Sequence, residues 1–259
     1  MNWLIDFGNS NVKWSYVFKN KYISGESLDY SALTPAELIE VIYKTISERT
    51  HPKTVLIASV GKSEFVSPFC KLLSRCSGAD VRLIESPKVL LGVTSSYVNP
   101  RQLGIDRLLA MGAAYQLSQS ACIVVDIGTA ITLDCIDQSG HHLGGLIVPG
   151  TDLMLESLKG ESSKLATNAQ FNAFTRSFPL LGKSTNDAML SGIHYLIVHF
   201  IREHVQIIKK TLLNDQVPLV FLTGGGSNVF VESLGDDWLF QPNLVLQGLH
   251  FFLISKDYQ

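Results

Sequence analysis

Short apolar runs alternate with segments of helical spacing along the first half of the chain. Strands are expected at 3–6, 12–18, 22–23, 54–60 and 81–84, and helices at 33–48, 64–74 and 107–117. The segment 86–104 contains two prolines and several turn residues, which predicts an irregular loop. This alternation of strands and helices predicts a sheet covered by helices.

The second half has the same character. Strands are expected at 121–125, 131–136, 143–148 and 218–222, and helices at 153–158, 186–213 and 243–254. The polar, weakly patterned segment 162–183 is predicted to be a loop that can move. No low-complexity linker marks a boundary, and the division is expected between 118 and 121. The predicted domains are therefore 1–118 and 119–259, with the option that the terminal helix packs back on the first domain.

One short turn follows an apolar run in each half. The two copies are Asp6-Phe7-Gly8-Asn9-Ser10 and Asp126-Ile127-Gly128-Thr129-Ala130, the second with Thr132 beyond it. Glycine lets a phosphate approach the main chain, and successive N–H groups in such a turn form an anion-binding concavity. One Asp-x-Gly alone is typical of an ordinary hairpin turn. Two copies in matched contexts predict two related halves that face each other across a nucleotide cleft.

The aspartates of the two turns predict cations. A carboxylate beside a phosphate repels it unless a cation lies between them. Asp6 and Asp126 therefore predict metal ions, preferably hard ones with oxygen ligands. Asn9, Ser10 and Thr129 can add side-chain hydrogen bonds.

A third glycine-rich segment, at 224–226, follows a predicted strand. It is expected to open a helix whose N–H groups contact phosphate or ribose. No GxxxxGK[ST] sequence occurs and no GxGxxG follows a strand, which argues against a P-loop and against a dinucleotide fold.

The tetrapeptide Gly104-Ile105-Asp106-Arg107 stands at a junction between a loop and a helix. In a purely structural role, Asp106 would be a helix N-cap that accepts backbone hydrogen bonds. In a catalytic role, it would be a general base that orients a substrate hydroxyl and takes its proton. Arg107 could then bind an anionic group of the substrate. Asp126, at the end of a strand, is the competing candidate for the base.

Composition narrows the class of protein. Of the 259 residues, 46% are hydrophobic and 17% are charged, so a large core can form. The net charge of −2, without a basic run, argues against nucleic acid as a partner. Four cysteines without CxxC spacing indicate a reduced, cytoplasmic protein, and neither a signal peptide nor a membrane span is expected. Histidines at 194, 199 and 204 do not align on one helix face, so packing or surface roles are expected rather than zinc binding.

Taken together, these motifs resemble type III pantothenate kinases, which belong to the acetate-kinase, sugar-kinase, Hsp70 and actin superfamily. The two turns, the tetrapeptide and the segment Gly144-Gly145-Leu146-Ile147-Val148-Pro149-Gly150 occur in the family's order over nearly the whole chain. The resemblance implies an α/β fold of two ribonuclease-H-like (actin-like ATPase) domains with a nucleotide cleft between them. It implies ATP-dependent phosphorylation of pantothenate to 4′-phosphopantothenate, the first step of coenzyme A biosynthesis.

The resemblance also implies site residues. For ATP these are Asp6, Phe7, Gly8, Asn9, Ser10, Asn11, Val12, Lys13 and Thr129. For pantothenate they are Tyr97, Gly104, Ile105, Asp106, Arg107 and Thr185. Asp106 would take the proton of the 4′-hydroxyl, Asp6 would lie near Mg²⁺, and Asp126 would hold a monovalent cation, K⁺ or NH₄⁺. The family's homodimers complete the pocket from the partner subunit, with the interface expected after Thr185.

Two alternatives stay open. The first is another kinase or phosphohydrolase of the superfamily, but 104–107 and Thr185 match the pantothenate family in particular. The second is a non-catalytic regulatory protein, such as the transcription accessory factor described within the family. The intact aspartates at 6, 106 and 126 argue against that reading.

Overall fold

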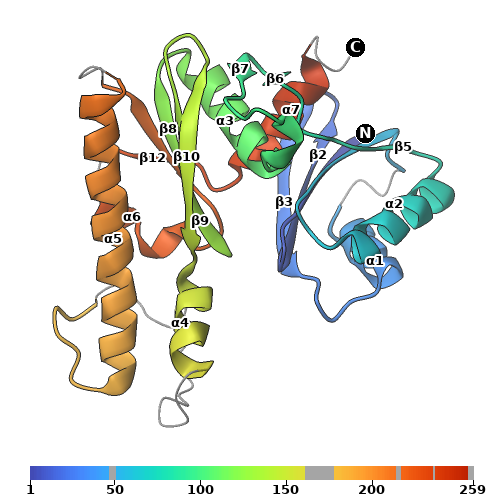
Figure 1. Cartoon of the computed structure of the whole chain (residues 1–259). Coiled ribbons are helices and arrows are strands. Elements are labelled where there is room, and N and C mark those ends of the chain that lie inside the picture. Colours follow the sequence, from blue (N-terminus) through green and yellow to red (C-terminus); the bar gives the residue numbers. More distant parts are fainter. Residues whose placement is uncertain (47–50, 161–177, 214–216, 236, 256–259) are drawn as a thin grey trace. The chain divides into compact units, whose positions relative to one another are not determined.

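The chain forms two compact units, each built on its own sheet. In the computed structural model, residues 1–46, 51–160, 178–213, 217–235 and 237–255 are described. The first unit comprises Met1–Gln116 and Leu244–Gln259, and the second comprises Leu117–Asn243 (Figure 1). The loop predicted at 162–183 lies outside the described residues as far as 177.

The first unit contains a five-stranded sheet in the order β3-β2-β1-β4-β5. The strands are β1 (Asn2–Phe7), β2 (Asn11–Phe18), β3 (Lys21–Asp29), β4 (Thr54–Ser59) and β5 (Asp80–Leu83). The first three pair in antiparallel fashion, whereas β4 lies parallel to β1 and β5 parallel to β4. β3 is longer than the two residues that the apolar pattern predicted, because an edge strand can pair through its backbone without an apolar face.

Helices cover both faces of this sheet. They are α1 (Pro35–Thr45), α2 (Ser63–Ser77) and α7 (Leu244–Ile254), and α3 (Ile105–Ser118) packs on α7 where Gly248 meets the Leu109 carbonyl. A capping box between Thr34 and Glu37 begins α1. α1 and α2 pack on each other over the core around Trp3 and Phe7, while α7 packs against β1, β2 and β4 (Figure 1). None of the helices in the described part of the chain has the length and apolar character needed to cross a bilayer.

The segment 86–104 is more ordered than predicted. It contains a small hairpin of β6 (Val89–Leu90) and β7 (Val93–Thr94), followed by the 3₁₀ turn η1 (Pro100–Gln102). Leu91 and Gly92, between the strands, both have positive φ angles, of 50° and 81°. Two such residues in succession are typical of the tight hairpin turn that matches strand twist.

The second unit repeats the plan of the first, with strand order β10-β9-β8-β11-β12. Its strands are β8 (Cys122–Ile127), β9 (Ala130–Ile136), β10 (His142–Pro149), β11 (Leu219–Thr223) and β12 (Leu239–Phe240). Again the first three strands form an antiparallel meander and the last two run parallel to the first. Each strand from β1 to β5 therefore has a counterpart from β8 to β12, which confirms the predicted pair of ribonuclease-H-like sheets.

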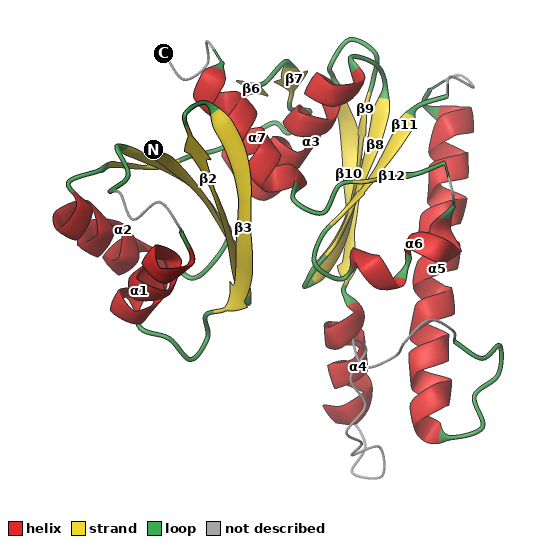
Figure 2. Ribbon diagram, turned by 180° about the vertical axis from the view of Figure 1, so that it is seen from behind, coloured by secondary structure: helices red, strands yellow, loops and turns green. Residues whose placement is uncertain are grey.

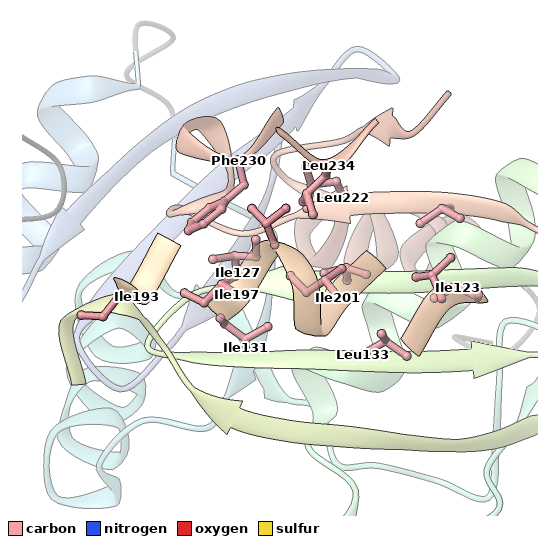
Figure 3. Packing of buried hydrophobic residues seen from close by; sticks show 14 of the residues in the cluster. Ile123, Ile127, Ile131, Leu133, Ile193, Ile197, Ile201, Leu222, Phe230 and Leu234 are labelled. Atoms are coloured by element: carbon pink, nitrogen blue, oxygen red, sulfur yellow. The ribbon is translucent and has the colours of Figure 1, made fainter. Parts of the chain in front are cut away.

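The long helix α5 (Thr185–Thr211) buries one face in the second core (Figure 2). Its residues Ile193, Ile197 and Ile201 pack in one cluster with Ile123 and Ile127 of β8 (Figure 3). The remaining helices are α4 (Thr151–Gly160), the 3₁₀ turn η4 (Ser227–Val229) and the four-residue α6 (Val231–Leu234). This packing fixes the ends of β8 and β11, where Asp126 and the glycine run at 224–226 lie.

Candidate active site

The first turn, at residues 6–10, is anchored by a buried side chain and by a main-chain hydrogen bond. Phe7 is fully buried in the core, and the Gly8 N–H closes the turn by donating to the Asn11 carbonyl at 2.9 Å. Asp6 precedes it as a half-buried residue, opposite Lys13 on β2 and Ala58 on β4. The turn thus joins a carboxylate, a cross-strand ammonium group and a short run of main-chain N–H groups.

The second turn is a shorter version of the first. Gly128 donates its N–H to the Ala130 carbonyl at 3.0 Å, so one residue fewer separates β8 from β9. Asp126 holds the position that Asp6 holds in the first unit, and it lies opposite Thr132 on β9 and Thr223 on β11. Thr129, at the tip of the turn, is exposed.

The glycine run at 224–226 packs over the end of β8. Gly224 has a φ of +98°, and a Cβ at this position would overlap with Asp126 Oδ1 and with the Ile127 carbonyl. Gly226 donates its N–H to that same carbonyl at 2.9 Å. The helix expected after this run is short, since the 3₁₀ turn η4 begins directly after it and the four-residue α6 follows. The run also packs closely on the second turn and on the Asp126 carboxylate.

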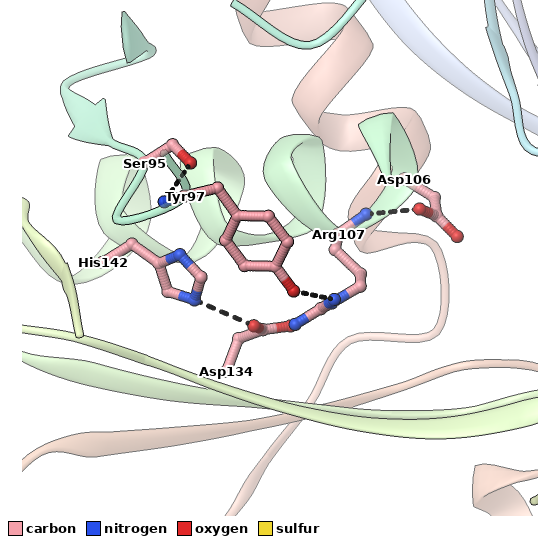
Figure 4. Close-up of polar contacts among 6 residues, drawn as sticks. All are labelled: Ser95, Tyr97, Asp106, Arg107, Asp134 and His142. Atoms are coloured by element: carbon pink, nitrogen blue, oxygen red, sulfur yellow. Dashed lines mark hydrogen bonds and ion pairs between the residues drawn. The ribbon is translucent and has the colours of Figure 1, made fainter. Parts of the chain in front are cut away.

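Asp106 lies inside α3 rather than at its N-cap. The helix begins at Ile105, and the Leu108 N–H donates to the Gly104 carbonyl at 3.1 Å. The carboxylate folds back so that Asp106 Oδ1 accepts the Arg107 N–H at 2.8 Å (Figure 4). A Cβ at Gly104 would overlap with this oxygen, which explains the glycine. The result is a half-buried carboxylate in the first turn of a helix, where the helix dipole stabilises negative charge.

Arg107 is brought together with Tyr97, as the resemblance implied. Its side chain is only 8% exposed, and Nη1 donates to Tyr97 Oη at 3.2 Å. Tyr97 is itself held by its N–H bond to Ser95 Oγ at 3.2 Å (Figure 4). In addition, Lys88 Nζ donates to the Tyr97 carbonyl at 3.2 Å. A guanidinium stays charged when buried, and its fork of donors matches a carboxylate. The first unit therefore presents an anion-binding guanidinium from the residue that follows Asp106.

A buried polar pair in the second unit escaped the sequence analysis. His142 Nε2 lies 3.0 Å from Asp134 Oδ1, and both side chains are almost fully buried (Figure 4). Asp134 is the one charged residue in the otherwise mainly apolar strand β9, and this was the only indication of the pair in the sequence. Its partner lies across the hairpin on β10, and the pairing depends on the bulge between His142 and Gly144.

Thr185 belongs to the second unit, whereas the other residues assigned to pantothenate belong to the first. It is the first residue of α5, after the N-cap Ser184, and it is exposed. With Met154 and Leu158 of α4 and Leu196 of α5, it lines a mainly apolar groove of about 600 Å³.

The residues predicted to bind metal, Asp6 and Asp126, are suited to cations whose other ligands are phosphate groups or water. Within the described residues, no group of three His, Cys, Asp or Glu side chains could hold a metal ion. Mg²⁺ commonly binds one or two carboxylates together with substrate phosphates and water, and the single carboxylate of Asp6 fits that mode. Asp126 differs, because Thr132 and Thr223 place hydroxyl groups on the neighbouring strands. This oxygen-rich surrounding fits a cation held next to the second turn.

Comparisons with known proteins identify the family of the chain. The family model for type III pantothenate kinase matches residues 2–207. The chain is 32% identical to the type III pantothenate kinase of Thiobacillus denitrificans, covering 95% of this chain and 93% of the relative. It is 31% identical to that of Azotobacter vinelandii, covering 95% of both chains.

Solved structures at lower identity share the fold. A Baf family transcriptional activator from Campylobacter jejuni matches with a TM-score of 0.57 at 20% identity, covering 99% of this chain and 100% of that one. The ethanolamine utilization protein EutJ from Carboxydothermus hydrogenoformans matches with a TM-score of 0.52 at 15% identity, covering 96% and 89%. At these identities the likeness shows the actin-like ATPase fold and nothing about activity.

Proposed function

The chain belongs to the type III pantothenate kinase family, and from this we propose how its residues carry out ATP-dependent phosphorylation of pantothenate. The product is 4′-phosphopantothenate, the first intermediate on the route to coenzyme A. The observation that carries the assignment is the family match over residues 2–207. The regulatory alternative is not favoured, since the transcriptional activator is only 20% identical and supports the fold alone.

Asp106 is the proposed general base. Its carboxylate is half-buried in the first turn of α3, where it accepts the main-chain N–H of Arg107. It accepts the proton of the pantothenate 4′-hydroxyl as that oxygen attacks the terminal phosphorus of ATP. The competing candidate, Asp126, lies under Gly224 and between two threonine-bearing strands, which suits a cation ligand better than a base that must reach a substrate.

The pantothenate carboxylate is the proposed partner of Arg107 and Tyr97. A guanidinium and a phenol hydroxyl that already contact each other present converging donors to an anion. Gly104 and Ile105 contribute the adjoining main chain, and Thr185 contributes a hydroxyl from the start of α5. Holding the substrate at its carboxylate leaves the 4′-hydroxyl to be oriented by Asp106.

The two turns are the proposed ATP phosphate sites. In the first, residues from Asp6 to Lys13 contribute main-chain N–H groups, the Asn9 and Ser10 side chains and the Lys13 ammonium. In the second, Thr129 adds a hydroxyl. Asp6 holds Mg²⁺ and Asp126 holds K⁺ or NH₄⁺; when bound, these cations offset phosphate charge.

We also propose that the protein is a homodimer whose interface includes α5. Leu196 on this helix is 56% exposed, and it belongs to the apolar groove that begins at Thr185. Apolar surface of this kind often marks an interface. Light scattering during gel filtration should give twice the chain mass, and Leu196→Asp should shift it to one chain. A single-chain mass for the wild type at micromolar concentration would contradict the dimer.

The experiment that tests the proposed function is ADP release from ATP with and without pantothenate, in sodium and then in potassium buffer. Asp106→Asn should lower kcat by roughly 10²–10⁴-fold, the usual contribution of a general base. Its thermal midpoint and ATP affinity should match the wild type. Asp152→Asn is the control, because Asp152 is an exposed acidic residue in the first turn of another helix, α4.

Three outcomes of this experiment would change the conclusion. Near-normal turnover by Asp106→Asn removes that residue from the role of base. A loss in Asp126→Asn that potassium does not modulate would move the base to Asp126. No pantothenate-dependent release from wild-type protein that binds ATP would contradict the kinase activity itself.

A further inference from the structure

Tyr30 is buried directly against the first turn. It is the first residue after β3, and its side chain is 4% exposed. The ring meets Phe7 edge-on, with centroids 5.5 Å apart and an interplanar angle of 86°, and it lies 4.8 Å from the Phe65 ring. Aromatic contacts on two sides hold the tyrosine in one orientation.

The same residue engages two carbonyl groups of the turn. Tyr30 Oη donates to the Gly8 carbonyl at 2.9 Å, and the Tyr30 N–H donates to the Ser10 carbonyl at 3.4 Å. The preceding carbonyl, of Phe7, accepts the Val60 N–H at 2.9 Å. Burial raises the pKa of Tyr30, which keeps its hydroxyl protonated as a donor.

These bonds decide which groups of the turn can meet an anion. In a planar trans peptide the C=O and N–H groups point in opposite directions. With the Gly8 carbonyl directed at Tyr30, the Asn9 N–H points to the opposite side. If this peptide turned over, it would present a carbonyl oxygen, which repels phosphate, in place of a donor.

The residue at position 61 gives independent evidence for the contact between the Tyr30 hydroxyl and the Gly8 carbonyl. A Cβ added at Gly61 would lie 2.7 Å from Tyr30 Oη and 2.8 Å from the Gly8 carbonyl. Both separations are too short for a carbon atom. Glycine at this position therefore leaves the space in which the hydroxyl meets the carbonyl.

In the second turn, main-chain N–H groups donate to the carbonyls that correspond to those of the first turn. The Ile127 carbonyl accepts the Gly226 N–H at 2.9 Å, as Phe7 accepts Val60. The Thr129 carbonyl accepts the N–H of Gly150 at 3.0 Å, and Gly150, like Tyr30, is the first residue after the third strand of its sheet. Main-chain N–H donors therefore lie at corresponding positions in both units. The first turn is longer, and its additional carbonyl, of Gly8, accepts a bond from the Tyr30 hydroxyl.

We infer that Tyr30 is a positioning residue for ATP, whose hydroxyl holds the Gly8–Asn9 peptide with its N–H toward the phosphates. This assignment rests on the proposed function only in taking ATP as the ligand of the turn. Tyr30 acts through the main chain and contacts no reacting atom. Its effect is therefore confined to binding of the phosphate groups.

The test is a comparison of nucleotide affinities by calorimetry without pantothenate. Tyr30→Phe keeps the ring and removes the hydroxyl, and we expect it to weaken ATP binding roughly 3–10-fold, as for one neutral hydrogen bond. Adenosine, which has no phosphate, should bind Tyr30→Phe as it binds the wild type. Tyr43→Phe is the matched control, because Tyr43 packs at the other end of β1, on Trp3, with its hydroxyl 2.9 Å from His51 Nδ1.

Gly61→Ala provides a second route to the same contact. Its methyl group displaces the Tyr30 hydroxyl, so this variant should also lose affinity for ATP and keep its affinity for adenosine. It serves as the test should Tyr30→Phe fail to fold.

Two results would overturn the assignment: unchanged ATP affinity in these variants, or equal weakening of ATP and adenosine. Wild-type protein that does not bind ATP would overturn it as well. Wild-type protein that binds ATP but does not phosphorylate pantothenate would contradict the proposed function alone, because the affinity comparison uses no pantothenate.

Discussion

The two Asp-x-Gly turns occupy the same place in equivalent sheets, yet their neighbours differ in chemistry. Asp6 faces Lys13 across the β1–β2 pair, whereas Asp126 faces Thr132 across the β8–β9 pair and Thr223 on β11. An ammonium group opposite the carboxylate suits contact with phosphate, and hydroxyl groups opposite it suit a bound cation. We therefore expect the two copies of one backbone frame to differ in the cation that each binds, although both contact phosphate.

The turns also differ in how they are held. The first is one residue longer and is braced by the Tyr30 side chain, while the second is braced by Gly150 and by the run at 224–226. A side-chain brace can lose a single hydrogen bond by mutation, but a glycine brace loses its close approach when any Cβ is added. Substitutions should therefore affect the two turns differently.

The largest effect is expected from the two aspartates. Asp6→Asn should lower kcat at least roughly 100-fold in both sodium and potassium buffers, because a bound metal contributes several kcal/mol of charge stabilisation. Asp126→Asn should instead lower turnover in potassium to the level of the wild type in sodium. The measurement is kcat for each variant in both buffers, over a series of Mg²⁺ concentrations.

Asp80→Asn is the control for this pair of variants, since Asp80 is an exposed carboxylate on β5 that pairs with Arg82. It should leave kcat and both cation responses unchanged. If Asp6→Asn and Asp126→Asn responded alike to the two buffers, the division of roles between the turns would be wrong.

A smaller effect, on stability, is expected at the glycine brace. Gly224→Ala combines a positive φ with overlap on Asp126 Oδ1 and the Ile127 carbonyl, so it should lower the free energy of unfolding by about 1–3 kcal/mol. Gly225→Ala is a neighbouring control, because a Cβ at Gly225 meets nothing within 4 Å. Urea unfolding should separate the two variants. Equal stability of both would show that the run does not brace β8.

The comparison also shows what the sequence could predict. Both turns, their strands and the order of the elements follow from local patterns, because a strand–glycine–strand signal lies within a few residues. The site cluster of Asp106, Arg107 and Tyr97 was reached through resemblance to a family, since the tyrosine lies ten residues before the arginine in a segment without periodicity.

Long-range contacts could not be predicted in this way. The Tyr30 hydroxyl meets a carbonyl 22 residues away, and no pattern at either position indicates the bond. The run at 224–226 was assigned to a helix start, because glycines after a strand commonly precede helices; its close fit over β8 depends on the tertiary structure. Asp134 and His142 pair across a hairpin whose bulge sets their register.

The smallest effect concerns acid stability of the second unit. His194 of α5 is 4% exposed, and its ring is stacked between Phe178, at 4.0 Å, and Phe230, at 5.2 Å. Burial lowers the pKa of this histidine below its ordinary value. Of the two roles expected for this histidine, packing and surface, His194 therefore has the packing role.

The sign of the pH dependence follows from this shift. The unfolded chain takes up the proton near the ordinary pKa of about 6.5, while the native protein takes it up only at lower pH. Between these values the unfolded state binds more protons, so stability rises with pH. The contribution of His194 is fully present above about pH 6.5 and is lost as the pH falls through the native pKa.

A variant that keeps an aromatic ring at position 194 but cannot take up a proton isolates this effect. His194→Phe keeps an aromatic ring between Phe178 and Phe230, so its thermal midpoint should fall less than that of the wild type between pH 7.5 and pH 5.5. His199→Phe is the control, because His199 is exposed on the same helix and should leave the wild-type acid response intact. The first unit contains its own histidine of lowered pKa, the half-buried His250, stacked at 5.3 Å on Tyr22. Acid sensitivity that persists in full in His194→Phe would assign the effect to the first unit.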